Sequence, residues 1–122
     1  MPTVLVVDDA VFMRTTIKRM LEDEQFEVIG EATNGLEAIE MYKKLLPDVV
    51  TMDITMPGMT GIEAVKEIIA EYPSAKIVMV SALGQQKLIV DALEYGAKDF
   101  ITKPFDPAQI VQVLHNVTSE VE

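Results

Sequence analysis

The 122-residue chain has 49% hydrophobic residues and no cysteine, which suffices for the core of one domain over residues 1–122 and excludes disulfides, thiolate metal sites and thiol nucleophiles. Its net charge of −10, from 20 acidic and 10 basic residues, disfavours nucleic acids and anionic membrane surfaces as partners, because both are bound through Lys and Arg. Since the sequence has no apolar run of about 18 residues and no secretory signal, we expect a cytoplasmic location and no membrane contact.

The chain opens with a pattern typical of a strand followed by a helix. Residues 3–7 form a short run rich in β-branched side chains, and this run ends at the acidic pair Asp8 and Asp9. The next stretch has apolar residues at the spacing of one helix face, at Met13, Ile17, Met20 and Leu21. An acidic turn between a strand and a helix is therefore predicted.

A second strand and helix are predicted next. Residues 26–32 alternate apolar residues with Glu and Gly, which favours a strand at the edge of a sheet over one at its centre. Asn34 and Glu37, three positions apart, predict the start of the following helix. We expect this helix to bury its larger apolar residues, which are Leu36, Ile39, Tyr42 and Leu46.

The centre of the chain places a single carboxylate at the end of a buried strand. Residues 49–52 form a continuous run typical of a strand covered on both faces, and Asp53 follows directly. A Pro-Gly turn at residues 57–58 comes next. Thr60 and Glu63 then form the Thr-x-x-Glu pattern of a capping box, which is worth about 1 kcal/mol. The loop after Asp53 is therefore held between two well-specified elements.

Two further strands end at polar residues. Residues 76–80 are another apolar run, and it stops at Ser81. Residues 98–102 have mixed polarity and stop at Lys103. A helix is predicted after each of these strands, and the final helix is expected to begin at the capping residue Asp106.

Five strands that alternate with five helices predict an α/β fold, in which a doubly wound, five-stranded parallel sheet has helices on both faces. The first, third and fourth strands are continuously apolar, whereas the second and fifth are mixed, so we expect the second and fifth at the edges. The strand order 2-1-3-4-5 of flavodoxin-like folds satisfies this expectation.

Polar residues follow four of the predicted strands: Asp8 and Asp9, Asp53, Ser81, and Lys103. Open parallel sheets bind ligands outside the carboxyl ends of the strands, near the point where the strand order reverses. Two carboxylates about 4 Å apart repel by about 4 kcal/mol at an effective dielectric of about 20, so a cation is needed there. Mg²⁺ fits, because it requires only one or two carboxylates, a carbonyl and waters. Acidic residues that bind a metal ion, the hydroxyl of Ser81 and the ammonium group of Lys103 are together the groups that phosphoryl transfer onto Asp53 requires.

Five segments of the chain resemble the receiver domains of response regulators, and together they cover essentially its whole length. They are VLVVDDA, EATNGLEA, PDVVTMDITMPGMTG, VMVSALG and GAKDFITKPF. Each segment alone is weak, but five in this order, one for each expected loop, are highly specific. The segments TMDITMP and SALGQQ are similar to the free-standing chemotaxis branch of the family. The resemblance therefore implies a single-domain regulator of two-component signalling, most simply in chemotaxis.

The resemblance also implies a chemistry for the acidic residues. Asp53 would accept a phosphoryl group from a phosphohistidine of a sensor histidine kinase of the chemotaxis type. Asp8, Asp9, Asp53 and the backbone carbonyl of Thr55 would form the Mg²⁺ site, with Asp9 rather than Asp8 as the direct ligand. The chain would be a phosphoacceptor switch and not an enzyme, with self-phosphotransfer and slow autodephosphorylation as its own activities.

The remaining site residues take their implied roles from the same resemblance. Ser81 and Lys103 would bind the phosphoryl oxygens, and the bond between Lys103 and Pro104 would be cis. Ser81 and Phe100 would form the switch, although Phe100 lacks the hydroxyl of the tyrosine often found there. A monomer is expected, whose fourth helix, fifth strand and fifth helix would bind a flagellar motor switch protein. A dedicated phosphatase would be a further partner.

Several alternatives stay open from the residues. A single-domain phosphorelay intermediate would differ only in its partner. A phosphohydrolase of the haloacid dehalogenase kind would have a second Asp two residues after its nucleophile, where Thr55 stands. A flavin carrier is disfavoured because Asp8 and Asp9 would repel a flavin phosphate. A receiver that serves only as a scaffold is disfavoured because all the acceptor-site residue types are retained.

Overall fold

The computed structural model describes residues 1–119 and contains a five-stranded parallel sheet of order β2-β1-β3-β4-β5. This is the predicted fold and strand order. The strands are β1 (Thr3–Val7), β2 (Glu27–Ala32), β3 (Val49–Asp53), β4 (Ile77–Ser81) and β5 (Asp99–Thr102). The helices between and after them are α1 (Val11–Glu22), α2 (Gly35–Leu45), α3 (Gly61–Glu71), α4 (Gln86–Glu94) and α5 (Pro107–Thr118).

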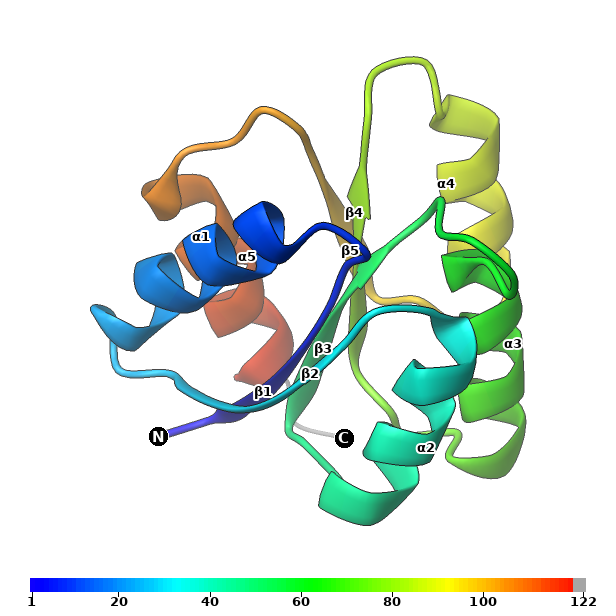
Figure 1. The fold of residues 1–122 in the computed structure, drawn as a ribbon, viewed down its shortest axis with the longest axis horizontal. Helices are drawn as coiled ribbons and strands as arrows, with labels where there is room; N and C mark the ends of the chain where they lie inside the picture. The colour runs from blue at the N-terminus through cyan, green and yellow to red at the C-terminus, as the bar shows by residue number, and fades with distance from the viewer. Residues whose placement is uncertain (120–122) are drawn as a thin grey trace.

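Helices cover both faces of the sheet. Figure 1 shows α1 and α5 on one side of the strands and α2, α3 and α4 on the other. Because successive strand residues point to opposite faces, Val4 and Val6 of β1 join the cluster under α1 and α5, whereas Leu5 and Val7 join the other cluster. The central strands β1, β3 and β4 are therefore apolar on both faces, and the mixed strands β2 and β5 lie at the edges as expected.

Three helices begin at the capping residues that the sequence indicates. The Asn34 side chain accepts a hydrogen bond from the backbone N–H of Glu37 at the start of α2. Thr60 and Glu63 form a full capping box at α3. Asp106 forms another at α5, where Pro107 is the first helical residue. These caps fix where the loops at the carboxyl edge of the sheet end.

The buried face of α2 agrees with the expected one at Ile39 and Tyr42 and differs from it at Leu36 and Leu46. Leu36 and Leu46 were expected in the core, yet each residue is 58% exposed. The buried residues of α2 are Gly35, Ala38, Ile39 and Tyr42. Gly35 is buried because α2 approaches the chain after β3 closely: a Cβ added at Gly35 would lie 2.7 Å from the carbonyl oxygen of Met59.

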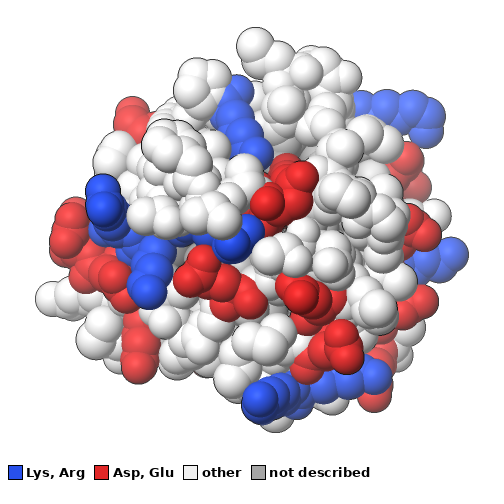
Figure 2. Space-filling model, viewed as in Figure 1, with Lys and Arg blue, Asp and Glu red and all other residues white. Residues whose placement is uncertain are grey.

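The surface charge agrees with the acidic composition. Figure 2 shows acidic and basic side chains interspersed over one face of the molecule, without an extended basic patch on that face. This face thus lacks the surface that phosphate backbones or anionic lipids require. In the described part of the chain, no helix has the length and apolar character needed to cross a membrane.

Candidate functional site

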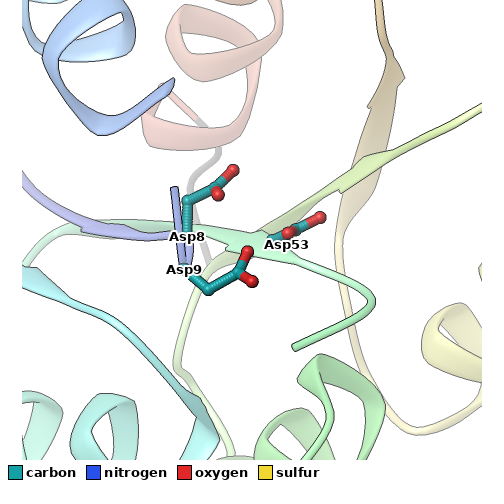
Figure 3. A group of neighbouring side chains, drawn as sticks. All are labelled: Asp8, Asp9 and Asp53. Atoms are coloured by element: carbon teal, nitrogen blue, oxygen red, sulfur yellow. The ribbon is translucent and has the colours of Figure 1, made fainter. Parts of the chain in front are cut away.

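Three carboxylates meet at the carboxyl edge of the sheet. Asp8 and Asp9 directly follow β1, and Asp53 is the last residue of the neighbouring strand β3. One oxygen from each carboxylate lies within 4.8 Å of the others, and Figure 3 shows the three side chains gathered at the two strand ends. This is the point between the first and third strands where the strand order reverses, so the predicted convergence is present.

Asp8 is buried and held from several sides. Its residue is 1% exposed, and its Oδ1 accepts a hydrogen bond of 2.9 Å from the backbone N–H of Ala10. The guanidinium of Arg14 donates to the Asp8 carbonyl oxygen at 2.7 Å and to the Glu31 carboxylate at 3.0 Å. Arg14 therefore ties the acidic turn to both α1 and β2. Sequence reasoning missed it, although its position within α1, just after the acidic pair, was a usable signal.

Asp9 differs from Asp8 in being exposed. Within residues 1–119 its carboxylate makes no hydrogen bond or ion pair, so both oxygens are free for a cation or for water. The oxygens of Asp8, by contrast, already have partners in the Ala10 N–H and the Lys103 ammonium group.

Asp53 is 8% exposed and lies beside the only ammonium group that reaches the described carboxylate cluster. The Nζ atom of Lys103 lies 3.5 Å from Asp53 Oδ1 and 3.3 Å from Asp8 Oδ2. Burial, together with the charges of Asp8 and Asp9, raises the pKa of Asp53 to about 6, against the opposing effect of Lys103. One positive charge thus offsets three negative ones incompletely.

This imbalance fits a hard divalent cation. The cluster offers carboxylate oxygens only, which are the ligands that Mg²⁺ prefers, and burial with like charges already disfavours the ionised form of Asp53. The expected carbonyl ligand, that of Thr55, lies in the exposed loop two residues after Asp53. The chemistry of the donor set therefore suits Mg²⁺.

A pH-dependent effect of Mg²⁺ on stability is expected from this geometry. Added Mg²⁺ should raise the melting temperature more at about pH 7.5 than at about pH 5, because the raised pKa of Asp53 lets protons compete with the metal as the pH falls through about 6. Scanning calorimetry with and without Mg²⁺ measures this. Asp23→Asn, at an exposed acid beyond the end of α1, is the control that should behave as the native chain. An equal rise at both pH values would contradict the assignment.

Ser81 ends β4 but does not point its hydroxyl at Asp53. The residue is fully buried, and its Oγ lies 3.2 Å from the carbonyl oxygen of Ile101 and 3.4 Å from the hydroxyl of Thr102, both on β5. Phe100 of β5 is 39% exposed and lines a mostly apolar groove along α4. The two residues expected to form the switch thus lie on adjacent strands, with the hydroxyl turned toward β5.

Lys103 follows β5, and its position is fixed by the backbone. Its N–H donates to the carbonyl oxygen of Ser81 at 2.7 Å, which continues the pairing of β4 with β5. The bond between Lys103 and Pro104 is cis, as expected. The side chain spans from the end of β5 to the carboxylates at the ends of β1 and β3, so it bridges the whole site.

Gly61, at the far end of the loop after Asp53, packs closely against the backbone of Asp53. A Cβ at this first residue of α3 would lie 2.0 Å from the carbonyl oxygen of Asp53. Gly61→Ala is therefore expected to destabilise the fold by about 2 to 3 kcal/mol and to weaken Mg²⁺ binding about tenfold or more, because Asp53 must move.

Gly58→Ala is the matched control for this prediction. Gly58 has a φ of 74° and no neighbour within 4 Å of an added Cβ, so its substitution should cost about 1 to 2 kcal/mol and leave Mg²⁺ affinity unchanged. Chemical denaturation and Mg²⁺ titration measure both effects. Equal loss of Mg²⁺ affinity in the two variants would contradict the role given to Gly61.

Comparison with known proteins gives consistent matches along the chain. The pattern of the response regulator receiver domain matches residues 4–115. A chemotaxis protein CheY of Thermotoga maritima is 56% identical over 115 residues, which cover 94% of this chain and 96% of that protein. A chemotaxis protein CheY of Bacillus subtilis is 52% identical over 112 residues, covering 92% of this chain and 93% of that one.

Solved structures agree with the sequence matches. A chain of the CheX-CheY-BeF3-Mg²⁺ complex from Borrelia burgdorferi superposes with a TM-score of 0.92 at 40% identity, covering 97% of this chain and 90% of that chain. The response regulator domain of Thermotoga maritima CheB superposes with a TM-score of 0.91 at 37% identity, covering 99% of this chain and 98% of that chain.

Proposed function

Because this chain belongs to the response regulator receiver domain family, we propose that it is a phosphorylation-operated switch in which Asp53 is the phosphoacceptor. The observation that carries this proposal is the arrangement around Asp53: a nearly buried carboxylate at a strand end, with Lys103 at 3.5 Å and two further acids beside it. Among the described carboxylates, only that of Asp53 is buried, lies beside two acidic residues that follow a neighbouring strand, and forms an ion pair with a lysine.

The proposed reaction moves a phosphoryl group from a phosphohistidine to Asp53. An oxygen of the ionised Asp53 attacks the phosphorus atom, a P–O bond forms, and the P–N bond to the histidine breaks. The electron pair of the broken bond stays on the imidazole nitrogen, which takes up a proton. Lys103 lies where its ammonium can follow the charge from Asp53 to the transferred oxygens, because its Nζ already sits between Asp8 and Asp53.

We assign Asp8, Asp9 and Asp53, with the carbonyl of Thr55, as the residues that would hold Mg²⁺. Bound Mg²⁺ would supply charge neutralisation for the carboxylates and the phosphoryl oxygens. Arg14 acts through Asp8: its bond to the Asp8 carbonyl keeps the acidic turn in place before any metal or phosphoryl group binds. The chain's own catalysis would be limited to this self-phosphotransfer and to slow hydrolysis of the aspartyl phosphate.

The proposed switch exchanges hydrogen bonds at the end of β4. A phosphoryl group adds a charge of about −1.5 to −2 beside Asp53 and offers strong acceptor oxygens. The Ser81 hydroxyl would leave the Ile101 carbonyl for one of these oxygens, which draws the loop after β4 inward. Phe100 could then turn from the groove along α4 into the space that the loop vacates. The surface formed by α4, β5 and α5 would change with it.

Chemotaxis is the proposed pathway, because relatives at 56% and 52% identity carry the name chemotaxis protein CheY. The donor would be a chemotaxis histidine kinase, and the target a flagellar motor switch protein that binds α4, β5 and α5. A dedicated phosphatase is also proposed, because a CheY relative is known in a complex with CheX. A phosphorelay intermediate remains the second candidate, since it would use the same site with a different partner.

Transfer from a radiolabelled, autophosphorylated chemotaxis kinase tests the donor, and binding to the motor switch protein with and without BeF3⁻ and Mg²⁺ tests the target. We expect label on the native chain, none on Asp53→Asn, and BeF3⁻-dependent binding. Label without any such binding would favour the phosphorelay alternative. No transfer from any histidine kinase would contradict the proposed function.

A further inference from the structure

A glutamine side chain bridges the two loops that flank Asp53. The backbone N–H of Ala82 donates to Oε1 of Gln85 at 2.7 Å, and Nε2 of Gln85 donates to the hydroxyl of Thr55 at 2.8 Å. Ala82 lies in the loop after β4, and Thr55 lies in the loop after β3. Gln85 is the residue just before α4, so one side chain ties both loops and the start of a helix together.

The direction of the Ala82 N–H follows from the strand before it. The Val80 carbonyl accepts a hydrogen bond from Ile54 beyond β3, and the Ser81 carbonyl accepts one from Lys103 beyond β5. Because backbone groups of successive strand residues point to opposite neighbours, the N–H of Ala82 points back to the β3 side. There β3 has already ended at Asp53, so no strand carbonyl receives it, and Gln85 does.

We propose that Gln85 is a positioning residue that holds the resting state by occupying the Ala82 N–H, and that an anionic group on Asp53 must displace it. This inference rests on the proposed phosphorylation of Asp53. A phosphoryl group there extends beyond the end of β3, on the side to which the Ala82 N–H points, and its oxygens are stronger acceptors than an amide. The loop after β4 then exchanges a bond to Gln85 for a bond to the phosphoryl group.

Removal of the Gln85 side chain should therefore favour the phosphorylated geometry. With BeF3⁻ and Mg²⁺ as the phosphoryl analogue, we expect Gln85→Ala to bind the analogue about 2- to 10-fold more tightly, which corresponds to the net worth of one hydrogen bond. The affinity for Mg²⁺ alone should not change, because Gln85 bonds the hydroxyl of Thr55 and none of the oxygen atoms assigned to the metal, which are the Thr55 carbonyl and the three carboxylates.

Gln86→Ala is the matched control. It makes the same chemical change one residue later, and the Gln86 side chain is exposed and has no hydrogen bond among the described residues. Thr55→Val, which replaces the hydroxyl at the other end of the bridge by a methyl group, should also tighten analogue binding. Combined with Gln85→Ala it should add nothing further, because the bridge is already broken.

The test is titration of BeF3⁻ with Mg²⁺, followed by NMR of the backbone amides, together with titration of Mg²⁺ alone. Tighter analogue binding by Gln85→Ala, with the Ala82 amide shifted in the resting protein and Mg²⁺ affinity kept, is the expected result. Native-like analogue affinity in Gln85→Ala overturns this inference alone, and so does a change in Mg²⁺ affinity of the same size. Failure of the native chain to bind the analogue overturns the proposed function and this inference with it.

Discussion

Replacement of Asp53 by Asn is expected to raise the free energy of unfolding of the metal-free protein by about 1 to 3 kcal/mol at neutral pH. Burial and the neighbouring carboxylates raise the pKa of Asp53 from 3.8 to about 6, so ionisation of this group opposes folding. One pKa unit corresponds to about 1.4 kcal/mol, and partial exposure reduces the full value. Asn keeps the shape of the protonated carboxyl group and removes the charge.

The pH dependence has a definite sign. Because the folded chain binds the Asp53 proton more tightly than the unfolded chain does, the contribution of this group to stability is full below about pH 4. It is lost as the pH rises through about 6. The advantage of Asp53→Asn should therefore be small near pH 4 and full at pH 7.

Urea denaturation at several pH values measures this effect, with Asp23→Asn as the control at an exposed acid. Mg²⁺ should shrink the advantage, since the metal stabilises only the native site. A destabilised Asp53→Asn at neutral pH, without metal, would contradict the electrostatic account of the cluster.

Lys103→Met should have the opposite effect, a loss of about 1 to 3 kcal/mol at neutral pH. The Lys103 side chain is 26% exposed, but its partner Asp8 is almost fully buried, and removal of the ammonium leaves uncompensated charges there. The pKa of Asp53 should rise above about 6, because Lys103 is the group that lowers it. Titration of the Asp53 carboxyl signal by NMR measures this shift.

Two further variants serve as controls for the Lys103→Met prediction. Lys98→Met, at an exposed lysine just before β5, should be close to neutral. Lys103→Met in the Asp53→Asn background should cost less than in the native chain, because one of the two partner charges is gone. An equal cost in both backgrounds would mean that Lys103 acts through packing and not through the carboxylates.

The fold could be predicted because the polarity of each strand indicates whether it lies at the centre or at the edge of the sheet. The buried strands β1, β3 and β4 are apolar along their length, and the edge strands are not, so composition predicts which strands lie at the edges. The known strand order of flavodoxin-like folds then satisfies this prediction. The site could be predicted for a related reason: parallel strands bring their carboxyl ends to one edge. Asp8, Asp53 and Lys103 therefore meet although they lie far apart in the sequence.

Close packing was less accessible to sequence reasoning. Leu36 and Leu46 are large and apolar, yet the buried face of α2 includes Gly35, whose position has no room for a side chain because α2 lies against the chain at Met59. Leu46 also ends the helix with a φ of 46°, so it leaves the helical face altogether. A hydrophobic pattern ranks residues by size and does not register how closely two backbones approach.

Side-chain bridges were the other features that sequence could not provide. Gln85 and Arg14 act through specific hydrogen bonds to the loops around the site, and such contacts depend on the positions of those loops. The direction of the Ser81 hydroxyl, toward Ile101 instead of Asp53, is likewise a rotamer choice made by the folded structure.

The most direct test of the central claim is the intact mass of the protein after incubation with acetyl phosphate or phosphoramidate, with and without Mg²⁺. We predict a gain of one phosphoryl group, about 80 Da, that requires Mg²⁺, is removed by hydroxylamine and is absent from Asp53→Asn. No adduct with either donor, or an adduct that persists in Asp53→Asn, would contradict the assignment of Asp53 as the phosphoacceptor.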